Sequence, residues 1–338
     1  MSSGPSPGFP HAALIVDSDD TLRSQLVPLV HRSLAQAQPV RMVVGVPTAA
    51  VIREALGAVA DQLTWDEPTM FSQRLGFVYD VFERYLTSLH SAGRRVHLIA
   101  EPQVISTLDP STPVDRVGAY LPYEAVCSDI FARYGCDVTC VWDSRNHPTL
   151  VLEGVRAVHT HLVVDGERRP SPHHIPTLNY LAARNEIPLA PLPSQVEIDL
   201  VTTELPQLAP MRAILADWAS GRQFADRATE EVVAAVSEVA TNGLVHGAPP
   251  VRVRCWRRRD TLVVQVDDAG ARPLPPTAGY RRPTPLPRVG GRGMWIARQL
   301  ADVVTTHTTR SQTSVRLHFP YGVTHRHPPE WLSGLRLR

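Results

Sequence analysis

The chain is 338 residues long, which is enough for about two domains, each with its own hydrophobic core. Its 34 basic and 33 acidic residues leave a net charge of +1, which argues against direct nucleic-acid binding or membrane binding through general electrostatics. Because the sequence contains no lysine, all 34 basic residues are arginine, and this excludes a P-loop lysine, the strand lysine of eukaryote-type protein kinases and Schiff-base chemistry.

Residues 12–165 alternate between predicted strands and predicted helices. Strands are expected at 12–16, 40–46, 94–102 and 136–143. Helices are expected from the acidic residues after the first strand to about Ala37, and at 48–59, 70–93 and 114–134. Because strands separated by helices pair in parallel, this half predicts an α/β domain with a parallel sheet.

Residues 166–195 contain many prolines and few periodic runs, which is typical of a linker with polyproline character. Beyond it, strands are predicted at 197–205, 251–256, 261–268 and 313–320, and helices at 210–220, 229–246 and 294–304. The two middle strands form a predicted antiparallel hairpin, so this half is expected to be an α+β sandwich.

Nothing in the sequence indicates export. Residues 1–10 lack the basic and then apolar pattern of a signal peptide, and no apolar run approaches the length of about 18 residues needed for a membrane span. The expected location is therefore the cytoplasm, without a membrane. Cys136 and Cys140 are interpreted as small buried hydrophobic residues rather than a redox or metal pair.

The predicted helix 229–246 carries a polar pair away from its apolar arc. That arc consists of Val232, Val233, Val236, Val239, Ala240, Gly243 and Leu244. Glu238 and Asn242 are four residues apart and project together from another stripe, on which Glu231 also falls. The stripe is either a solvated face or a functional pair in which Asn242 binds Mg²⁺ and Glu238 accepts a proton.

The strand 261–268 ends in a carboxylate that needs a partner. Asp268 continues the apolar face of the strand, and the exocyclic amine of adenine would satisfy its oxygen atoms. Gly270 completes D-x-G, where a ligand can approach the backbone closely. The alternative interpretation of this sequence is an ordinary turn at the end of a strand.

Gly291, Arg292 and Gly293 precede the helix 294–304 directly. Glycines at a helix N-terminus expose backbone N–H groups to phosphate, and the helix dipole favours the anion. In a chain without lysine, the cations available to meet phosphate are Arg292 and its loop neighbours Arg281, Arg282 and Arg288.

In this order, the three motifs resemble the GHKL ATPases, and most closely the bacterial anti-sigma factor serine kinases. The matching stretches are 237–247, 266–270, 290–302 and 313–320. The resemblance implies a Bergerat-type ATP pocket in a two-layer sandwich, with ATP and Mg²⁺ as cofactors. By position, Glu238 matches the general base, Asn242 the Mg²⁺ ligand, Asp268 the adenine-binding aspartate, Gly270, Gly291 and Gly293 the nucleotide-loop glycines, and Thr313 the threonine of the closing strand.

This sequence departs from the family at two points. Arg272 stands where the family often has a second glycine, and the loop between the motifs carries six prolines between Pro273 and Pro287. Asp267 is an alternative adenine partner, although the alternation of the strand points it to the other face.

The N-terminal half resembles the MEDS domain, a methanogen/methylotroph sensory module, in its short motifs at 11, 100–102, 123–124, 140–143 and 159–161. The resemblance implies an α/β fold similar to that of the RecA/KaiC ATPases. The candidate residues for a sensory site are His11, Glu101, Tyr123, Glu124 and His161, and each histidine is otherwise an ordinary core or surface residue.

These observations predict a cytoplasmic regulator with a MEDS-like sensory domain at 8–165, a Pro-rich linker at 166–195, an ATPase domain at 196–322 and a tail at 323–338. By resemblance, the expected activity is transfer of the γ-phosphoryl group of ATP to a serine or threonine of a partner protein. The expected partners are an anti-sigma factor antagonist and/or a sigma factor, with a small-molecule or protein signal at the N-terminal domain.

Two alternatives remain. ATP could be a structural or allosteric ligand in a non-catalytic module that regulates its partners by binding alone. The chain could also be similar to the sensor histidine kinases, but 166–225 predicts no long helix pair with a phospho-acceptor histidine. The sequence leaves open whether the chain forms a homodimer.

Overall fold

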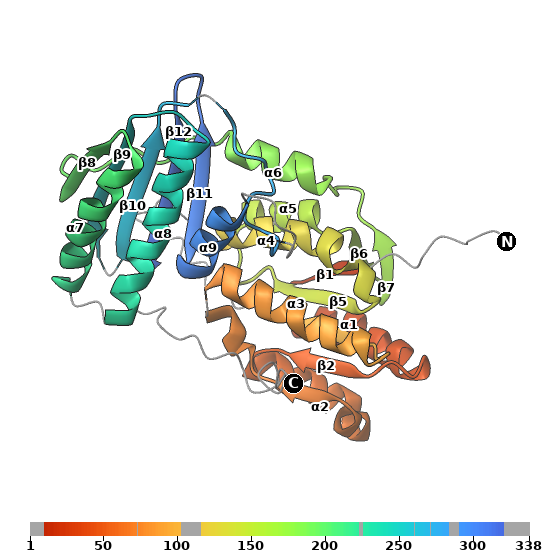
Figure 1. The fold of residues 1–338 in the computed structure, drawn as a ribbon. Helices are drawn as coiled ribbons and strands as arrows, with labels where there is room; N and C mark the ends of the chain where they lie inside the picture. The colour runs from red at the N-terminus through yellow and green to blue at the C-terminus, as the bar shows by residue number, and fades with distance from the viewer. Residues whose placement is uncertain are drawn as a thin grey trace. The chain divides into compact units, whose positions relative to one another are not determined.

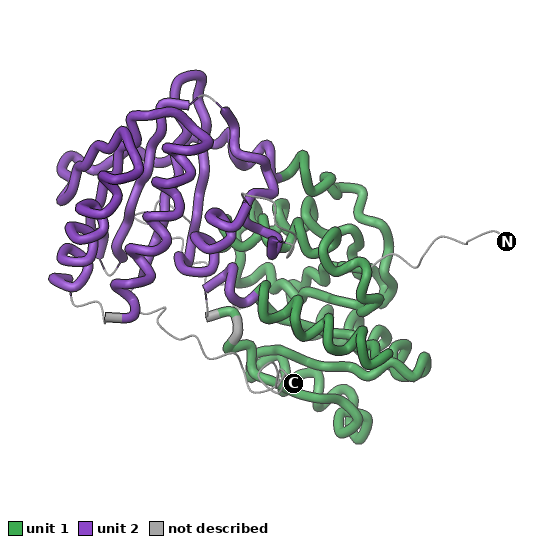
Figure 2. The backbone as a smooth tube through the Cα atoms, viewed as in Figure 1, with its two compact units in different colours: residues 1–72, 79–180, 327–338 green, residues 73–78, 181–326 purple. Residues whose placement is uncertain are grey.

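The computed structural model describes residues 10–72, 74–102, 116–222, 226–259, 261–270, 272–283 and 291–320. The chain divides into two compact units, coloured separately in Figure 2. The first contains Tyr79–Tyr180 and the residues up to Ser72, and the second contains Gln73–Val78 and the chain from Leu181 to Arg326. The predicted tail at 323–338 lies outside the described residues.

A mixed seven-stranded sheet forms the centre of the first unit (Figure 1). Its strands follow the order β3-β2-β4-β5-β1-β6-β7. Its strands are β1 (His11–Val16), β2 (Val40–Val43), β3 (Thr64–Asp66), β4 (His97–Ala100), β5 (Asp137–Asp143), β6 (His161–Val164) and β7 (Glu167–Pro170). All neighbours pair in parallel except β6 and β7. The predicted parallel sheet is therefore confirmed, with one antiparallel strand added at its edge.

Helices connect the parallel strands, as the alternation predicts, except the last of them, which follows the antiparallel strand β7. They are α1 (Asp19–Ala35), α2 (Val46–Leu56), α3 (Leu75–Ser91), α4 (Arg116–Phe131), α5 (Thr149–Val158) and α6 (Thr177–Asn185), with short 3₁₀ turns at Gly57–Gln62, Pro68–Ser72 and Ala132–Tyr134. Ser18, rather than an aspartate, caps α1 by accepting a hydrogen bond from the Thr21 backbone N–H at 3.1 Å. Asp19 and Asp20 instead occupy the first turn, where the helix dipole favours negative charge.

The segment 166–195, expected to be an extended linker, contains the strand β7 and the helix α6. Its prolines lie at or beyond the ends of these elements, where a missing backbone N–H costs nothing. Residues at and after the end of α6 belong to the second unit and contact its sheet. Asn185 accepts a hydrogen bond from the Thr306 hydroxyl at 2.8 Å, and the Ala190 carbonyl accepts one from Arg316 at 2.8 Å.

The second unit has an antiparallel five-stranded sheet in the order β11-β12-β10-β9-β8 (Figure 1). Its strands are β8 (Ile198–Thr202), β9 (Val251–Arg258), β10 (Thr261–Asp268), β11 (Val303–Thr308) and β12 (Thr313–Pro320). Its helices are α7 (Leu208–Ser220), α8 (Asp226–Val245) and α9 (Arg292–Leu300), with a 3₁₀ turn at Leu205–Gln207. The predicted hairpin of β9 and β10 is confirmed.

The apolar arc of α8 packs into a core shared with α7, α9 and the sheet. Val232, Val236 and Ala240 are completely buried there, as are Leu262 and Val264 of β10. The prediction of one helix over 294–304 is wrong at its end, because α9 stops at Leu300 and β11 begins at Val303. The β-branched run VVTT favours the strand, where such side chains fit the pleated surface.

Candidate functional site

The two carboxylates that end β10 lie on opposite faces of the five-stranded sheet. Asp268 is on the helix side, where a methyl group placed on Gly243 of α8 would come within 3.2 Å of its Cβ. Asp267 is buried on the other side and accepts hydrogen bonds there from Gln265, Gln312, Ser314 and Arg254. Asp267 is therefore already occupied by protein donors, whereas Asp268 faces the helices.

Asp268 is surrounded by glycine backbone. A Cβ on Gly247 would lie 2.4 Å from its Oδ1 atom, and a Cβ on Gly270 would lie 2.7 Å from the same atom. The Gly270 N–H donates a hydrogen bond to Oδ1 at 2.8 Å. Partial burial raises the pKa of the Asp268 carboxyl above its usual value, against the effect of the backbone donors. Residues 247 and 270 must therefore be glycine for the backbone to pack this closely against the Asp268 carboxylate.

Thr313 at the start of β12 holds the loop that follows Asp268. Its hydroxyl donates to the Gly270 carbonyl at 2.9 Å and lies 3.3 Å from the Arg272 carbonyl. The Arg272 side chain itself is exposed. The Thr313 side chain therefore fixes the D-x-G loop by binding the carbonyl groups of the loop backbone. The sequence motif alone does not reveal this contact.

The GxG motif lies directly against the polar pair of α8. A Cβ on Gly293 would lie 2.7 Å from Asn242 Nδ2 and 2.9 Å from Glu238 Oε2. Only a glycine lets the first turn of α9 approach both side chains so closely. The GxG motif and the E-x-x-x-N pair therefore meet at one place, although Asn242 and Gly293 are 51 residues apart in the sequence.

Gly291 caps α9 in the left-handed conformation, with φ +93°, where a side chain would be strained. Arg292 follows it with an exposed side chain. Arg281 and Arg282 are also exposed, and Arg282 lies over the Trp295 ring at 5.5 Å. The fourth predicted phosphate cation, Arg288, falls outside the described residues.

Glu231, which shares the polar stripe of α8, is not part of this arrangement. It is buried and forms an ion pair with Arg74 at 2.8 Å, while Arg227 lies 3.6 Å away. Burial lowers the pKa of Arg74 to about 10. The polar stripe is therefore neither wholly solvated nor wholly directed at the glycine loops.

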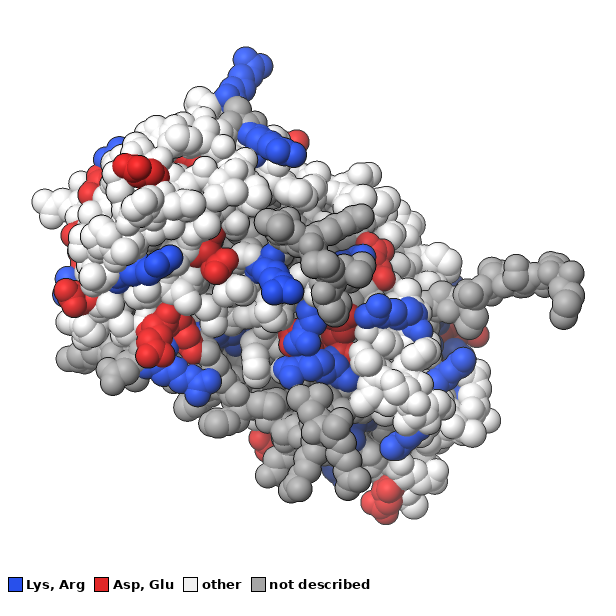
Figure 3. Space-filling view, in the orientation of Figure 1, with Lys and Arg blue, Asp and Glu red and all other residues white. Residues whose placement is uncertain are grey.

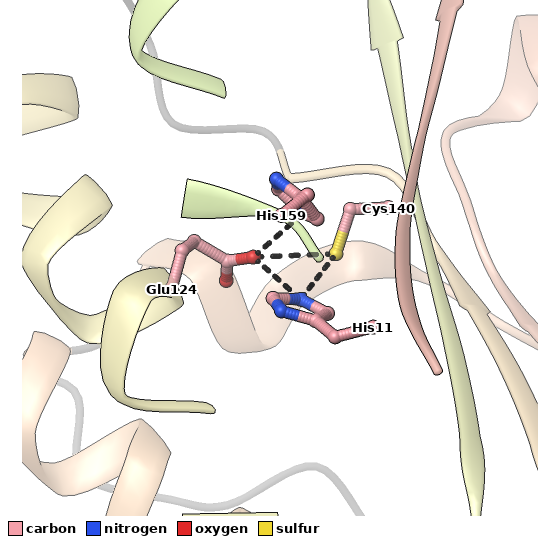
Figure 4. A group of neighbouring side chains, drawn as sticks. All are labelled: His11, Glu124, Cys140 and His159. Atoms are coloured by element: carbon pink, nitrogen blue, oxygen red, sulfur yellow. Dashed lines mark hydrogen bonds and ion pairs between the residues drawn. The ribbon is translucent and has the colours of Figure 1, made fainter. Parts of the chain in front are cut away.

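Two of the five predicted sensory residues meet in the core of the first unit. His11 Nε2 and Glu124 Oε2 are 3.0 Å apart, with Cys140 and His159 beside them (Figure 4). Burial and the neighbouring His159 lower the pKa of His11 to about 4. Burial opposes ionisation of Glu124, but the imidazoles of His11 and His159 hold its pKa well below the usual value.

The other three predicted sensory residues have different surroundings. Tyr123 stacks on the Tyr79 ring with centroids 4.8 Å apart. Glu101 accepts a hydrogen bond from the Gly45 backbone N–H at 2.8 Å. His161 pairs with the Thr160 hydroxyl at 2.9 Å. Sequence reasoning thus selected His161 from the motif HTH, whereas His159 is the histidine that enters the cluster.

Two family models match the chain. That of MEDS, the methanogen/methylotroph DcmR sensory domain, matches residues 10–160, and that of the histidine kinase-like ATPase domain matches residues 201–319. A sensory module joined to an ATPase domain of this type defines a class of regulatory proteins that use ATP. The chain carries an N-terminal MEDS domain and a C-terminal histidine kinase-like ATPase domain, which confirms both resemblances.

Among solved structures, the RsbU and RsbW domains of a Mycobacterium tuberculosis protein match at 17% identity, over 36% of this chain and 32% of that chain, with a TM-score of 0.28. The SiaB–SiaC complex from Pseudomonas aeruginosa matches at 12% identity, over 42% of this chain and 94% of that chain, with a TM-score of 0.30. The chain thus spans about a third of the mycobacterial structure, and these likenesses are too distant to assign a function. No curated protein matches the chain.

No helix in the described parts of the chain is both long and apolar enough to cross a bilayer. Basic and acidic side chains both appear on the face drawn in Figure 3, as the near-neutral net charge of +1 predicts.

Proposed function

We propose that the protein is an ATP-binding serine/threonine protein kinase of the anti-sigma factor type, controlled by its MEDS domain. The observation that carries this proposal is the packing of Gly293 against Glu238 and Asn242, which lie 2.9 and 2.7 Å from the position that a Cβ on this glycine would occupy. This contact brings the N-terminus of α9, which suits phosphate binding, next to two polar side chains. The Glu238 carboxylate suits proton transfer, and the Asn242 amide suits Mg²⁺ binding.

The residues present fit Mg-ATP. The carboxylate of Asp268 would accept a hydrogen bond from the adenine amine, and a Cβ on Gly291, at the start of α9, would meet no atom within 4 Å, which leaves space beside this helix start for phosphates. Arg292 would meet the phosphates as an exposed cation. The Asn242 side-chain oxygen would hold Mg²⁺, which supplies charge neutralisation for the phosphates when bound.

Glu238 would act on the acceptor hydroxyl. Its carboxylate takes the proton of a serine or threonine hydroxyl of the partner, the hydroxyl oxygen forms a bond to the γ-phosphorus, and the bond from that phosphorus to the leaving ADP oxygen breaks. The donors around the phosphates stabilise the charge that develops on the phosphoryl oxygens.

The same proposal includes the fold of each domain and the cellular location of the protein. The ATPase domain, 196–322, is a Bergerat-type two-layer sandwich, and the MEDS domain, 8–165, is similar to RecA/KaiC folds. The segment 166–195 connects them, and the protein works in the cytoplasm. Its partners are an anti-sigma factor antagonist and/or a sigma factor.

A non-catalytic ATP-binding module is the second candidate, because Arg272 stands where a loop glycine is expected and would narrow the approach to the phosphates. A histidine kinase-like function is the third. In the described part of 166–222, neither α6 nor α7 contains a histidine, so no phospho-acceptor lies on a helix there.

Incubation of the full chain with radiolabelled ATP, Mg²⁺ and candidate antagonist proteins tests the leading proposal. The expected result is label on a serine or threonine of one antagonist. ATP binding by calorimetry without any such label would favour the non-catalytic module. Label on a histidine of the chain itself would favour the third candidate.

Changing Gly293 to alanine is expected to lower phosphoryl transfer by at least about 10-fold, because the new methyl group displaces the Glu238 and Asn242 side chains from the metal and base positions. Thermal unfolding should change little, since the displaced atoms are the ends of flexible side chains. Turnover of this variant at the wild-type rate would show that the pair does not act at this place.

A further inference from the structure

The buried cluster in the first unit brings four potential metal ligands together from distant parts of the chain. Cys140 of β5 lies 3.4 Å from Glu124 Oε2 and 3.6 Å from His11 Nε2. His159 Nε2 lies 3.3 Å from the same Glu124 oxygen (Figure 4). All four ligand atoms lie within 4.8 Å of one another, and the residues are at most 3% exposed.

These separations are those of a tetrahedral metal site. With Zn–N and Zn–O bonds near 2.1 Å and a Zn–S bond near 2.3 Å, neighbouring ligand atoms lie roughly 3.3–3.6 Å apart. Four of the six pairs of ligand atoms span 3.0–3.6 Å, and the two pairs that His159 forms with His11 and Cys140 lie within 4.8 Å. His11, Glu124 and Cys140 therefore already have the spacing of a tetrahedral site, and an ion would be held by all four side chains once His159 turns toward the other three.

The proton on His159 supports a cation at the centre. His159 Nδ1 lies 2.8 Å from the Val155 carbonyl oxygen, which can only accept, so Nδ1 carries the hydrogen. In the neutral ring, Nε2 then offers a lone pair toward the Glu124 carboxylate. His159 is fully buried, and within the described residues its Nε2 atom has no hydrogen-bond partner. A neutral ring and a carboxylate 3.3 Å apart would be two acceptors, and either a proton on Nε2 or a metal ion between them turns this contact into an attractive one.

Outer hydrogen bonds orient the other ligands in the same way. His11 Nδ1 faces the Ser128 hydroxyl at 3.3 Å, which leaves Nε2 directed at the cluster. The Tyr79 hydroxyl donates to Glu124 Oε1, so the second oxygen, Oε2, faces the other three ligand atoms. Such partners fix the tautomer and rotamer of metal ligands.

We propose that His11, Glu124, Cys140 and His159 bind one divalent transition-metal ion of the zinc type inside the MEDS domain. Two imidazoles, one thiolate and one carboxylate in a tetrahedral arrangement suit Zn²⁺, whereas Mg²⁺ and Ca²⁺ prefer all-oxygen sites. Since four protein ligands leave no open position and all are buried, the ion stabilises the joined elements β1, β5, α4 and the end of α5.

The register of the sheet explains why two of the ligands share a face. β1 and β5 are parallel neighbours in which Ala13 pairs with Cys140. His11 is two residues before Ala13 and so points to the same side of the sheet. Glu124 reaches this side from α4, and His159 reaches it as the residue that follows the last turn of α5.

The full-length protein produced with Zn²⁺ or with Co²⁺ in the medium tests the site, with metal content measured by plasma mass spectrometry. We expect about one metal ion per chain. The cobalt form should show the strong visible absorption of a tetrahedral ion and a thiolate-to-cobalt band in the near ultraviolet. Folded wild-type protein without metal in both preparations would overturn the proposal.

Cys140→Ser is expected to remove the thiolate-to-cobalt band and most of the bound metal. Cys136→Ser is the matched control, because Cys136 is equally buried and four residues away but outside the cluster. Retention of the band in Cys140→Ser would overturn the assignment. If Cys140→Ser does not fold, Tyr79→Phe replaces it: loss of the Glu124 partner should weaken metal affinity about 10–100-fold, and unchanged affinity would count against the site.

Discussion

Replacing Glu238 by glutamine is expected to slow phosphoryl transfer by at least about 100-fold while leaving ATP affinity nearly unchanged. Glutamine keeps the size of the side chain but cannot accept the proton of the acceptor hydroxyl. The nucleotide contacts proposed for Asp268 and the glycine loops do not involve this carboxylate. Single-turnover transfer from radiolabelled ATP to the partner, with calorimetric titration of ATP alongside, measures the two quantities separately.

The matched control for Glu238 is Glu230→Gln, which changes the same residue type on the same helix, eight residues earlier, at an exposed position. This variant should transfer phosphate at the wild-type rate. Equal losses in both variants would mean that charge on α8 matters in general and that Glu238 is not the base. A loss of ATP binding in Glu238→Gln would instead give this residue a role in holding the nucleotide.

Replacing Asp268 by asparagine is expected to lower ATP affinity by at least about 100-fold, because a site built to accept a hydrogen bond from the ligand would then present a donor or an unpaired group. The carboxylate also favours the adenine amine over the carbonyl that guanine carries at the same position. The wild-type protein should therefore prefer ATP to GTP, and Asp268→Asn should lose that preference.

Asp267→Asn is the control on the neighbouring residue. Asp267 faces the other side of the sheet and forms a buried ion pair with Arg254, so we expect this change to lower the free energy of unfolding by about 2 kcal/mol or more. ATP affinity of the folded variant should stay close to that of the wild type. Equal loss of ATP affinity in both variants would show that the two carboxylates were assigned to the wrong faces.

A pH titration of ATP binding gives an independent check on Asp268. Because its pKa is raised by partial burial, the carboxylate begins to protonate at a higher pH than an ordinary aspartate as the solution is acidified. A protonated carboxyl loses its hydrogen bond from adenine, so affinity for ATP should fall as the pH decreases through this raised value.

Local patterns in the sequence determined which side chains of the C-terminal unit share a face of a strand or helix. The alternation of β10 predicted the faces of Asp267 and Asp268, and the helical spacing of α8 predicted both its buried valines and its Glu238–Asn242 pair. These patterns are reliable because the side-chain directions of a strand or helix follow from its own backbone geometry. The boundary of α9 was less predictable, since a β-branched run can continue a helix or begin a strand until its neighbours decide.

The N-terminal cluster depended on tertiary structure. His11 and Cys140 are 129 residues apart and become neighbours only because β1 pairs with β5, a strand order that no local pattern specifies. The choice of His159 over His161 depended on where α5 ends, since the Val155 carbonyl of its last turn orients the His159 ring. The sequence by itself therefore determined which residues share an element and a face. Only the tertiary structure decided which polar groups are buried together. Strand order and helix ends control that outcome, and both depend on contacts between elements rather than within them.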